Sequence, residues 1–190
     1  CHAFSTIATA GFSPKNSSIG YYGSAYFDWV TIIFMFLGGM AFMLFYHMLR
    51  SEWKLVQVNT ELRWYACIVL FLCCITTLIL SINGPYENFF DSLRYASFQV
   101  TSLLTTTGFT TADYELWPQS AQMLLYIACF IGACAGSTTS GIKIVHFVII
   151  WKYMLTTIKK MFHQPRTILP IHINQRTIDP FAINLSICYV

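Results

Sequence analysis

The sequence predicts an all-α membrane protein built from helix–pore-loop–helix repeats around a central ion pathway. Hydrophobic residues make up 56% of its 190 residues and charged residues only 10%, whereas a soluble domain carries about 25% charged residues. The apolar residues gather in three long stretches. A short Thr-x-Gly-Phe motif occurs twice, each time ahead of one of these stretches. Together these observations exclude a soluble fold and point to repeated membrane hairpins.

The three apolar stretches differ in what they predict. Residues 29–49 and residues 64–83 each have the length of one membrane-spanning helix, which needs about 20 apolar residues. The third stretch has no charge from 116 to 142 and continues after Lys143 to Trp151. It is too long for one simple span, and polar residues interrupt its middle. We therefore expect an interrupted helix there.

The basic residues predict the orientation. Arg50, Lys54 and Arg63 lie between the first two stretches, and five more Lys and Arg residues follow the third, so these sections hold eight of the eleven. Cytoplasmic loops of membrane proteins accumulate Lys and Arg. The opposite side is acidic, and an acidic mouth raises the local concentration of cations. Its acidic residues are Asp28, Glu87, Asp91, Asp113 and Glu115.

The two Thr-x-Gly-Phe motifs belong to an internal repeat. Placing Gly11 on Gly108 also places Thr9 on Thr106, Phe12 on Phe109 and Ser5 on Ser102. Further on, residues 36–39 match residues 130–133 once three residues are dropped from the second copy. Each copy contains a short helix, a Thr-x-Gly-Phe turn and a membrane helix. Pores and transporters are often built from such repeats.

A turn of this composition suits a cation. Glycine admits backbone dihedrals that other residues avoid, so successive carbonyls can point the same way and replace the hydration shell of a monovalent cation. The short helix before each turn directs its negative C-terminal end to the same place. The simpler alternative is that the hydroxyl groups only bond across a helix interface. The candidate ligands are the backbone carbonyls of Ala8, Thr9, Ala10, Gly11, Thr105, Thr106, Thr107 and Gly108.

The middle of the third stretch is a candidate gate. Glycine and hydroxyl residues at mid-membrane favour a break in the helix, and a break is tolerated only where it is buried or lines a cavity. Lys143 there costs about 2.5–3.5 kcal/mol unless it is paired or hydrated. The alternative is a continuous helix with a small-residue packing face at Gly132 and Gly136. The candidate gate residues are Gly136, Ser137, Thr138, Thr139, Ser140, Gly141 and Lys143.

The remaining function classes have less support. The chain has no nucleophile–base set, phosphate-binding loop or dinucleotide fingerprint, so we expect neither an enzyme nor a cofactor. We also expect no nucleic-acid partner; the partner surface is the lipid membrane. The alternative function is a secondary transporter with discontinuous helices for another small solute or cation. The filter-like loops are expected on one side of the membrane only, and this argues against that alternative.

Several segments resemble the TrkH family of Trk-type potassium uptake proteins. Residues 2–22 resemble its second pore loop, residues 103–118 its third, and residues 132–143 its interrupted helix with an intramembrane loop. Pro165-Arg166 through Asp179-Pro180 is similar to its linker to the fourth repeat. The family often has more glycine than this chain at Ala10 and within residues 136–141, which suggests a stiffer gate here.

The resemblance implies an internal fragment of a multi-pass protein of the bacterial inner membrane. Residues 1–50 would hold the second pore loop and its following helix, and residues 51–63 a cytoplasmic linker. Residues 64–160 would form the complete third repeat, and residues 161–190 a linker and the start of the fourth. The resemblance further implies potassium as the transported ion, a homodimer, and a cytoplasmic nucleotide-binding regulatory subunit like TrkA.

Overall fold

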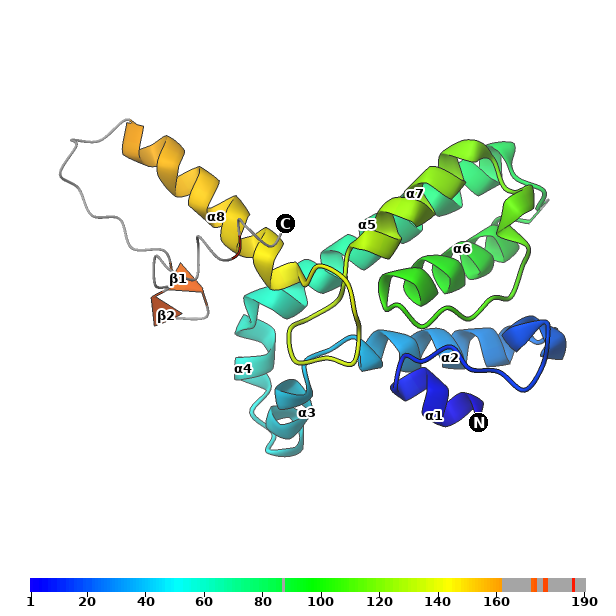
Figure 1. The fold of residues 1–190 in the computed structure, drawn as a ribbon, viewed down its shortest axis with the longest axis horizontal. Coiled ribbons are helices and arrows are strands. Elements are labelled where there is room, and N and C mark those ends of the chain that lie inside the picture. Colours follow the sequence, from blue (N-terminus) through cyan, green and yellow to red (C-terminus); the bar gives the residue numbers. More distant parts are fainter. Residues whose placement is uncertain (87, 162–171, 174–175, 178–185, 187–190) are drawn as a thin grey trace.

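The structure, a computed structural model, describes residues 1–86, 88–161, 172–173, 176–177 and 186 (Figure 1). Apart from one short strand pair, the regular elements of this part are helices, so the all-α prediction is confirmed. The elements are α1 (His2–Ile7), the 3-10 helix η1 (Ser18–Tyr22), α2 (Ala25–Gly38), α3 (Phe42–Leu49), α4 (Trp53–Val58), α5 (Thr60–Asn83), α6 (Phe89–Leu104), η2 (Tyr114–Leu116), α7 (Gln119–Phe130), α8 (Ile144–Met161), β1 (His172–Ile173) and β2 (Arg176–Thr177). The two strands pair antiparallel.

The first apolar stretch is not the single span that its length suggests. Within the described residues, α5 alone is long and apolar enough to cross a membrane, whereas α2 and α3 pass that test only together and are bent by 99°. At Gly39, in the break, any Cβ would collide with the hydroxyl group of Tyr65. The bend therefore depends on a close approach that glycine allows. Hydropathy and length carry no sign of this bend.

The interruption predicted in the third stretch is present. Helix α7 ends at Phe130, α8 begins at Ile144, and no helix is assigned from 131 to 143. The second helix of each repeat is therefore broken near equivalent sites: α2 ends at Gly38, which the alignment places on Gly132, and α7 ends two residues earlier, at Phe130. The packing-face alternative needs a continuous helix through Gly136 and does not hold.

The two copies of the repeat share their helix boundaries. Helix α1 ends at Ile7 and α6 ends at Leu104, which the alignment of Gly11 on Gly108 makes equivalent. Helices α2 and α7 begin at Ala25 and Gln119, the same spacing that matches residue 36 with residue 130. The sequence repeat is thus a structural repeat.

Helix α6 occupies the centre of the fold. It packs against α5 and α7 on one side and against α2 on the other (Figure 1). Its Val100 and Leu104 lie in one hydrophobic cluster with Tyr65 and Leu80 of α5, whereas its Phe98 lies in a second cluster with Met35 of α2. This packing fixes the end of α6, from which the second Thr-x-Gly-Phe loop begins.

Candidate functional site: two pore loops and an intramembrane loop

The two Thr-x-Gly-Phe loops leave their helices with the same hydrogen bonds. The amide of Ala10 donates to the carbonyl of Ser5 at 2.9 Å, and the amide of Thr107 donates to that of Ser102 at 2.8 Å. The two preceding amides of each loop repeat this correspondence. The turns are therefore built alike, although 97 positions separate the equivalent residues by the numbering of Gly11 and Gly108.

The backbone dihedrals match as well. Thr9 and Thr106 have positive φ angles of 49° and 54°, and Gly11 and Gly108 have φ angles of 72° and 79°. A β-branched residue at positive φ is an outlier, and such strain persists only where the surroundings enforce it. Both copies carry it at the same position. Strain of this kind gathers at ligand and switch sites.

The two loops are neighbours in space. A Cβ placed on Gly11 would collide with the carbonyl oxygen of Thr107. Farther out, the amide of Gly20 donates to the carbonyl of Thr110 at 3.2 Å, and Ser18 Oγ accepts from the amide of Thr110 at 3.3 Å. The structure thus brings together the predicted ligand residues of the two repeats.

The two loops differ in how far the described chain encloses them. In the second loop, Ser102 Oγ donates to the carbonyl of Phe109 at 2.7 Å, and Phe109 is fully buried. Its counterpart Phe12 is 74% exposed, and Ser5 Oγ has no hydrogen-bond partner among the described residues. The backbone conformation is therefore common to both loops, whereas the side-chain contacts that hold it differ.

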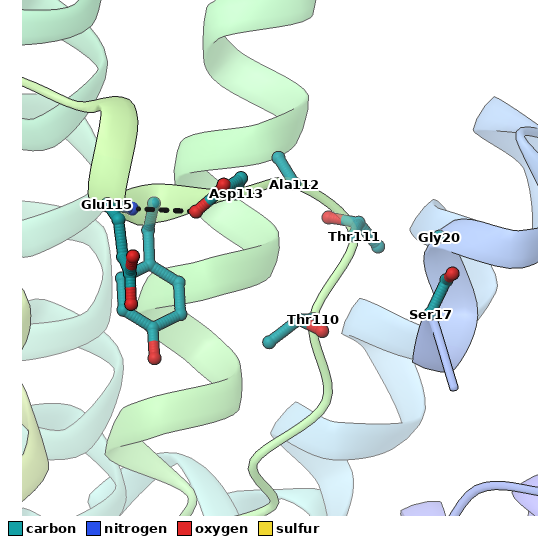
Figure 2. A pocket seen from close by; sticks show the side chains of 8 residues that line it. Ser17, Gly20, Thr110, Thr111, Ala112, Asp113 and Glu115 are labelled. Atoms are coloured by element: carbon teal, nitrogen blue, oxygen red, sulfur yellow. Dashed lines mark hydrogen bonds between the residues drawn. The ribbon is translucent and has the colours of Figure 1, made fainter. Parts of the chain in front are cut away.

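A cavity of about 370 Å³ lies at the outer ends of the loops. Figure 2 shows Ser17 and Gly20 on one side and residues 110–115 on the other. Asp113 accepts a hydrogen bond from the amide of Glu115 at 3.1 Å. Two carboxylates that the sequence assigned to the acidic mouth therefore lie beside this cavity.

Residues 131–143, which the sequence is expected to place within the membrane, form a closed loop, called the intramembrane loop below. Its two ends meet in a parallel bridge between Ile131 and Ile142, where the amide of Gly132 donates to the carbonyl of Ile142 at 2.9 Å. A Cβ on Gly132 would collide with the carbonyl oxygen of Ser140. Gly132 therefore lets the loop close on itself.

The intramembrane loop contacts both Thr-x-Gly-Phe loops through equivalent threonines. Thr9 Oγ1 donates to Thr138 Oγ1 at 3.1 Å, and the amide of Ser140 donates to Thr106 Oγ1 at 3.0 Å. Thr138 Oγ1 also lies 3.3 Å from the carbonyl oxygen of Ile7, the last residue of α1. The predicted gate residues thus adjoin the predicted filter residues at the ends of α1 and α6.

Lys143 has partners inside the loop. Its ammonium group donates to the carbonyl and to the hydroxyl of Thr139, the latter at 3.0 Å. Thr139 Oγ1 in turn accepts from the amide of Ala133 at 3.3 Å. The loop residues therefore satisfy the charge that the sequence placed within the membrane, as its cost requires.

Sequence reasoning missed two supports of this loop. The α2–α3 break holds it by backbone bonds, from the amide of Cys134 to the carbonyl of Gly39 and from the amide of Phe42 to the carbonyl of Gly136, both at 3.1 Å. Glu61 of α5 accepts from the amide of Ala135. The Gly38-Gly39 pair could have indicated the break. An acidic residue at the start of a span gave no comparable signal.

Oxygen atoms dominate the chemistry of this site. In the described part of the chain, no three His, Cys, Asp or Glu side chains gather as metal ligands would. Where the loops meet, the structure places neutral oxygens instead: the carbonyl oxygen of Thr107 beside Gly11, and the hydroxyls of Thr9 and Thr106 against the 131–143 loop. Such neutral oxygens suit a weakly held monovalent cation rather than a tightly bound transition metal.

Comparison with known proteins gives consistent results. The family model "TrkH: Cation transport protein" matches residues 1–55 and 91–186. The Trk system potassium uptake protein TrkH of Salmonella typhimurium is 34% identical over 178 residues, and that of Halomonas elongata is 32% identical over 179 residues. Each alignment covers 93% of this chain, which spans 37% and 36% of these relatives.

A solved structure shares the fold. The crystal structure of the potassium transporter TrkH from Vibrio parahaemolyticus superposes with a TM-score of 0.85 at 30% identity, over 98% of this chain and 40% of that one. The relatives are transporters, and the fold is that of a helical membrane transporter. The family model covers well over half of the residues. The chain therefore belongs to the TrkH family of cation transport proteins.

Proposed function

We propose that this chain supplies two of the pore loops of a protein that moves potassium ions across the membrane. The observation that carries the proposal is the matched backbone of the loops at Thr9–Gly11 and Thr106–Gly108, with positive φ at equivalent residues. Two such turns, in contact through Gly11 and Thr107, supply part of a ring of carbonyls around one ion path. Potassium uptake by the similar proteins supports the choice of ion.

The selectivity filter in this proposal consists of backbone oxygens. The carbonyls of Ala8 to Gly11 and of Thr105 to Gly108 replace the hydration shell of the ion, which passes as cargo and is not a resident cofactor. The C-terminal ends of α1 and α6 add a partial negative charge beside them. The acidic residues Asp113 and Glu115 raise the cation concentration at the outer mouth.

Residues 136–141 act as the gate. Their hydrogen bonds to Thr9 and Thr106 support a resting position across the inner end of the filter, where the loop narrows the path. Because the bonds from residues 136–141 to Thr9 and Thr106 join neutral groups, the loop can leave the filter without unfolding a helix. Movement of the loop would then open the path.

The surrounding system follows from the same family. We propose a homodimer in the bacterial inner membrane, regulated by a cytoplasmic nucleotide-binding subunit like TrkA, with no enzymatic activity and no cofactor in this chain. The name "Trk system" of the relatives supports a system with more than one component. The basic residues between the first two apolar stretches and those from Lys152 onward mark the sections of the chain expected on the cytoplasmic side.

Growth rescue tests the function. Bacteria that lack their own potassium uptake should grow at low external potassium when they express the full-length protein. The same protein carrying Gly11→Asp, expressed to the same level, should not rescue growth, because the side chain collides with Thr107. Equal growth of the two strains would contradict the proposal.

A further inference from the structure

We propose that Glu61 is a positioning residue that holds the intramembrane loop against the pore loops. A carboxylate oxygen of Glu61 accepts a hydrogen bond from the amide of Ala135. Glu61 lies in the first turn of α5, and Ala135 lies in the first half of the loop at 131–143. The inference rests on the proposed function, because it assigns a residue to the gate.

The start of α5 does not need Glu61 as a cap. Asn59 caps the helix, and its Oδ1 accepts from the amide of Leu62 at 3.1 Å. A carboxylate in the first turn is favoured by the helix dipole wherever it points. The dipole does not explain why the oxygen reaches a backbone amide 74 positions away. The contact with Ala135 therefore serves the loop rather than the helix.

The amide of Ala135 needs this partner. Other amides of the loop bond to neutral oxygens, such as that of Cys134 to Gly39 and that of Ser140 to Thr106. Ala135 is partly buried, so its amide carries part of a desolvation penalty when it loses its partner, and a bond to a charged acceptor is among the stronger kinds. Removing the Glu61 oxygen therefore weakens the seated position of the loop.

Side chains of opposite charge hold the loop at two places. Glu61 holds its first half through Ala135, and Lys143 holds its second half through Thr139. The two charges also attract each other. Between these points, Thr138 and Ser140 contact the threonines of the pore loops. Loss of the Glu61 bond would therefore weaken the contacts of the loop with Thr9 and Thr106.

The test uses thiol labelling of the full-length protein in membranes. Ser137→Cys places a reporter on a partly buried part of the loop and keeps the backbone amides that bond to Glu61 and Thr106. A small water-soluble maleimide measures its accessibility, relative to the same background without the reporter. Potassium flux is measured in parallel on each variant without the reporter.

The substitutions at Glu61 separate the effect of side-chain length from the effect of charge. Glu61→Ala should speed labelling about tenfold, since the bond to a charged group is lost. Glu61→Asp keeps the charge but shortens the side chain, so it should also label faster. Glu61→Gln loses the charge but keeps an acceptor oxygen at the same reach, so it should label more slowly than both Glu61→Ala and Glu61→Asp. The control variants are Asn59→Ala, which weakens the start of α5, and Glu52→Ala, which removes an acidic residue away from the loop.

The outcomes are distinct. Faster labelling with Asp than with Gln supports positioning by Glu61, whereas the reverse order would assign Glu61 to helix electrostatics and overturn the inference. Equal labelling of Glu61→Ala and Asn59→Ala would overturn it too. Faster labelling without any change in potassium flux would support the position of the loop and count against its role as a gate. Absence of potassium flux in the unaltered protein would contradict the proposed function. The labelling rates would still test whether Glu61 positions the loop.

Discussion

Gly11 of one repeat lies so close to the carbonyl oxygen of Thr107 of the other that no side chain fits between them. Gly11 has a φ of +72°, in the region that glycine adopts without penalty. At the equivalent Gly108, with a φ of +79°, an added Cβ meets nothing within 4 Å in the described chain. Two glycines with the same backbone conformation thus stand in different surroundings.

This difference makes the two glycines a matched pair for substitution. Gly11→Ser and Gly108→Ser both force a side chain into the left-handed region, at a cost of about 1–2 kcal/mol. Only Gly11→Ser adds a collision. Both should lower the ratio of potassium to sodium flux, and Gly11→Ser should also lower total flux. An unchanged ratio of potassium to sodium flux in Gly108→Ser would contradict the assignment of residues 105–108 to the filter.

The hydroxyl contact between Thr9 and Thr138 predicts non-additive substitutions. Thr9→Val and Thr138→Val each remove the 3.1 Å bond and should raise flux by loosening the loop. The double variant should gain less than the sum, with a coupling of about 0.5–1.5 kcal/mol. A control cycle pairs Thr9→Val with Thr31→Val, because Thr31 donates to the carbonyl of Phe27 on an exposed face and does not bond to Thr9. Full additivity in the Thr9–Thr138 cycle would show that the contact has no influence on transport.

Deletion of residues 136–141 should raise potassium flux, because it removes the constriction beneath the filter. Flux into proteoliposomes, normalised to the amount of folded protein, measures the effect. The deletion also removes the bond between Phe42 and Gly136, so folding is checked by thermal unfolding. A folded deletion variant with lower flux than the unaltered protein would show that the loop is not a barrier.

The ion pair between α2 and α6 predicts a stability effect. Asp28 and Arg94 approach to 3.5 Å, and the side chain of Asp28 is only 8% exposed. Arg94 also pairs with Asp91 at 3.1 Å. Arg94→Met leaves Asp28 without this partner and should destabilise the protein by about 3–5 kcal/mol.

The effect on the two partners should be unequal. Asp28→Asn should cost less than Arg94→Met, because Arg94 keeps its bond to Asp91. Adding Asp28→Asn to Arg94→Met should recover part of the lost stability. Thermal unfolding in detergent checks this order. Equal losses from both single substitutions would contradict the arrangement.

Local sequence signals were enough for the repeat and for the interrupted helix. Gly11 and Gly108 mark turns that need positive φ, and the polar residues 136–141 within an apolar stretch mark a break. These features reflect the backbone requirements of single residues, which composition reveals directly. The equivalence of Thr9 with Thr106 followed from the same alignment.

The bend between α2 and α3 and the role of Glu61 depend on contacts distant in sequence. The chain bends at Gly39, where the hydroxyl of Tyr65 approaches the backbone. Glu61 contacts Ala135 only once α5 and the loop are packed together. Glycine at position 39 hints at a break but not at its angle, and a glutamate in the first turn of a helix is an ordinary residue there. Only the three-dimensional arrangement separates these cases.

The most direct test of the central claim is ion-selective flux through the full-length protein in proteoliposomes. Uptake of rubidium, as a tracer for potassium, should saturate, be displaced by potassium and resist a large excess of sodium. The Gly11→Ser variant should lose this preference, because Gly11 and Thr107 can no longer approach each other. Equal displacement by sodium and potassium, or a preference that survives Gly11→Ser, would contradict a filter formed by these two loops.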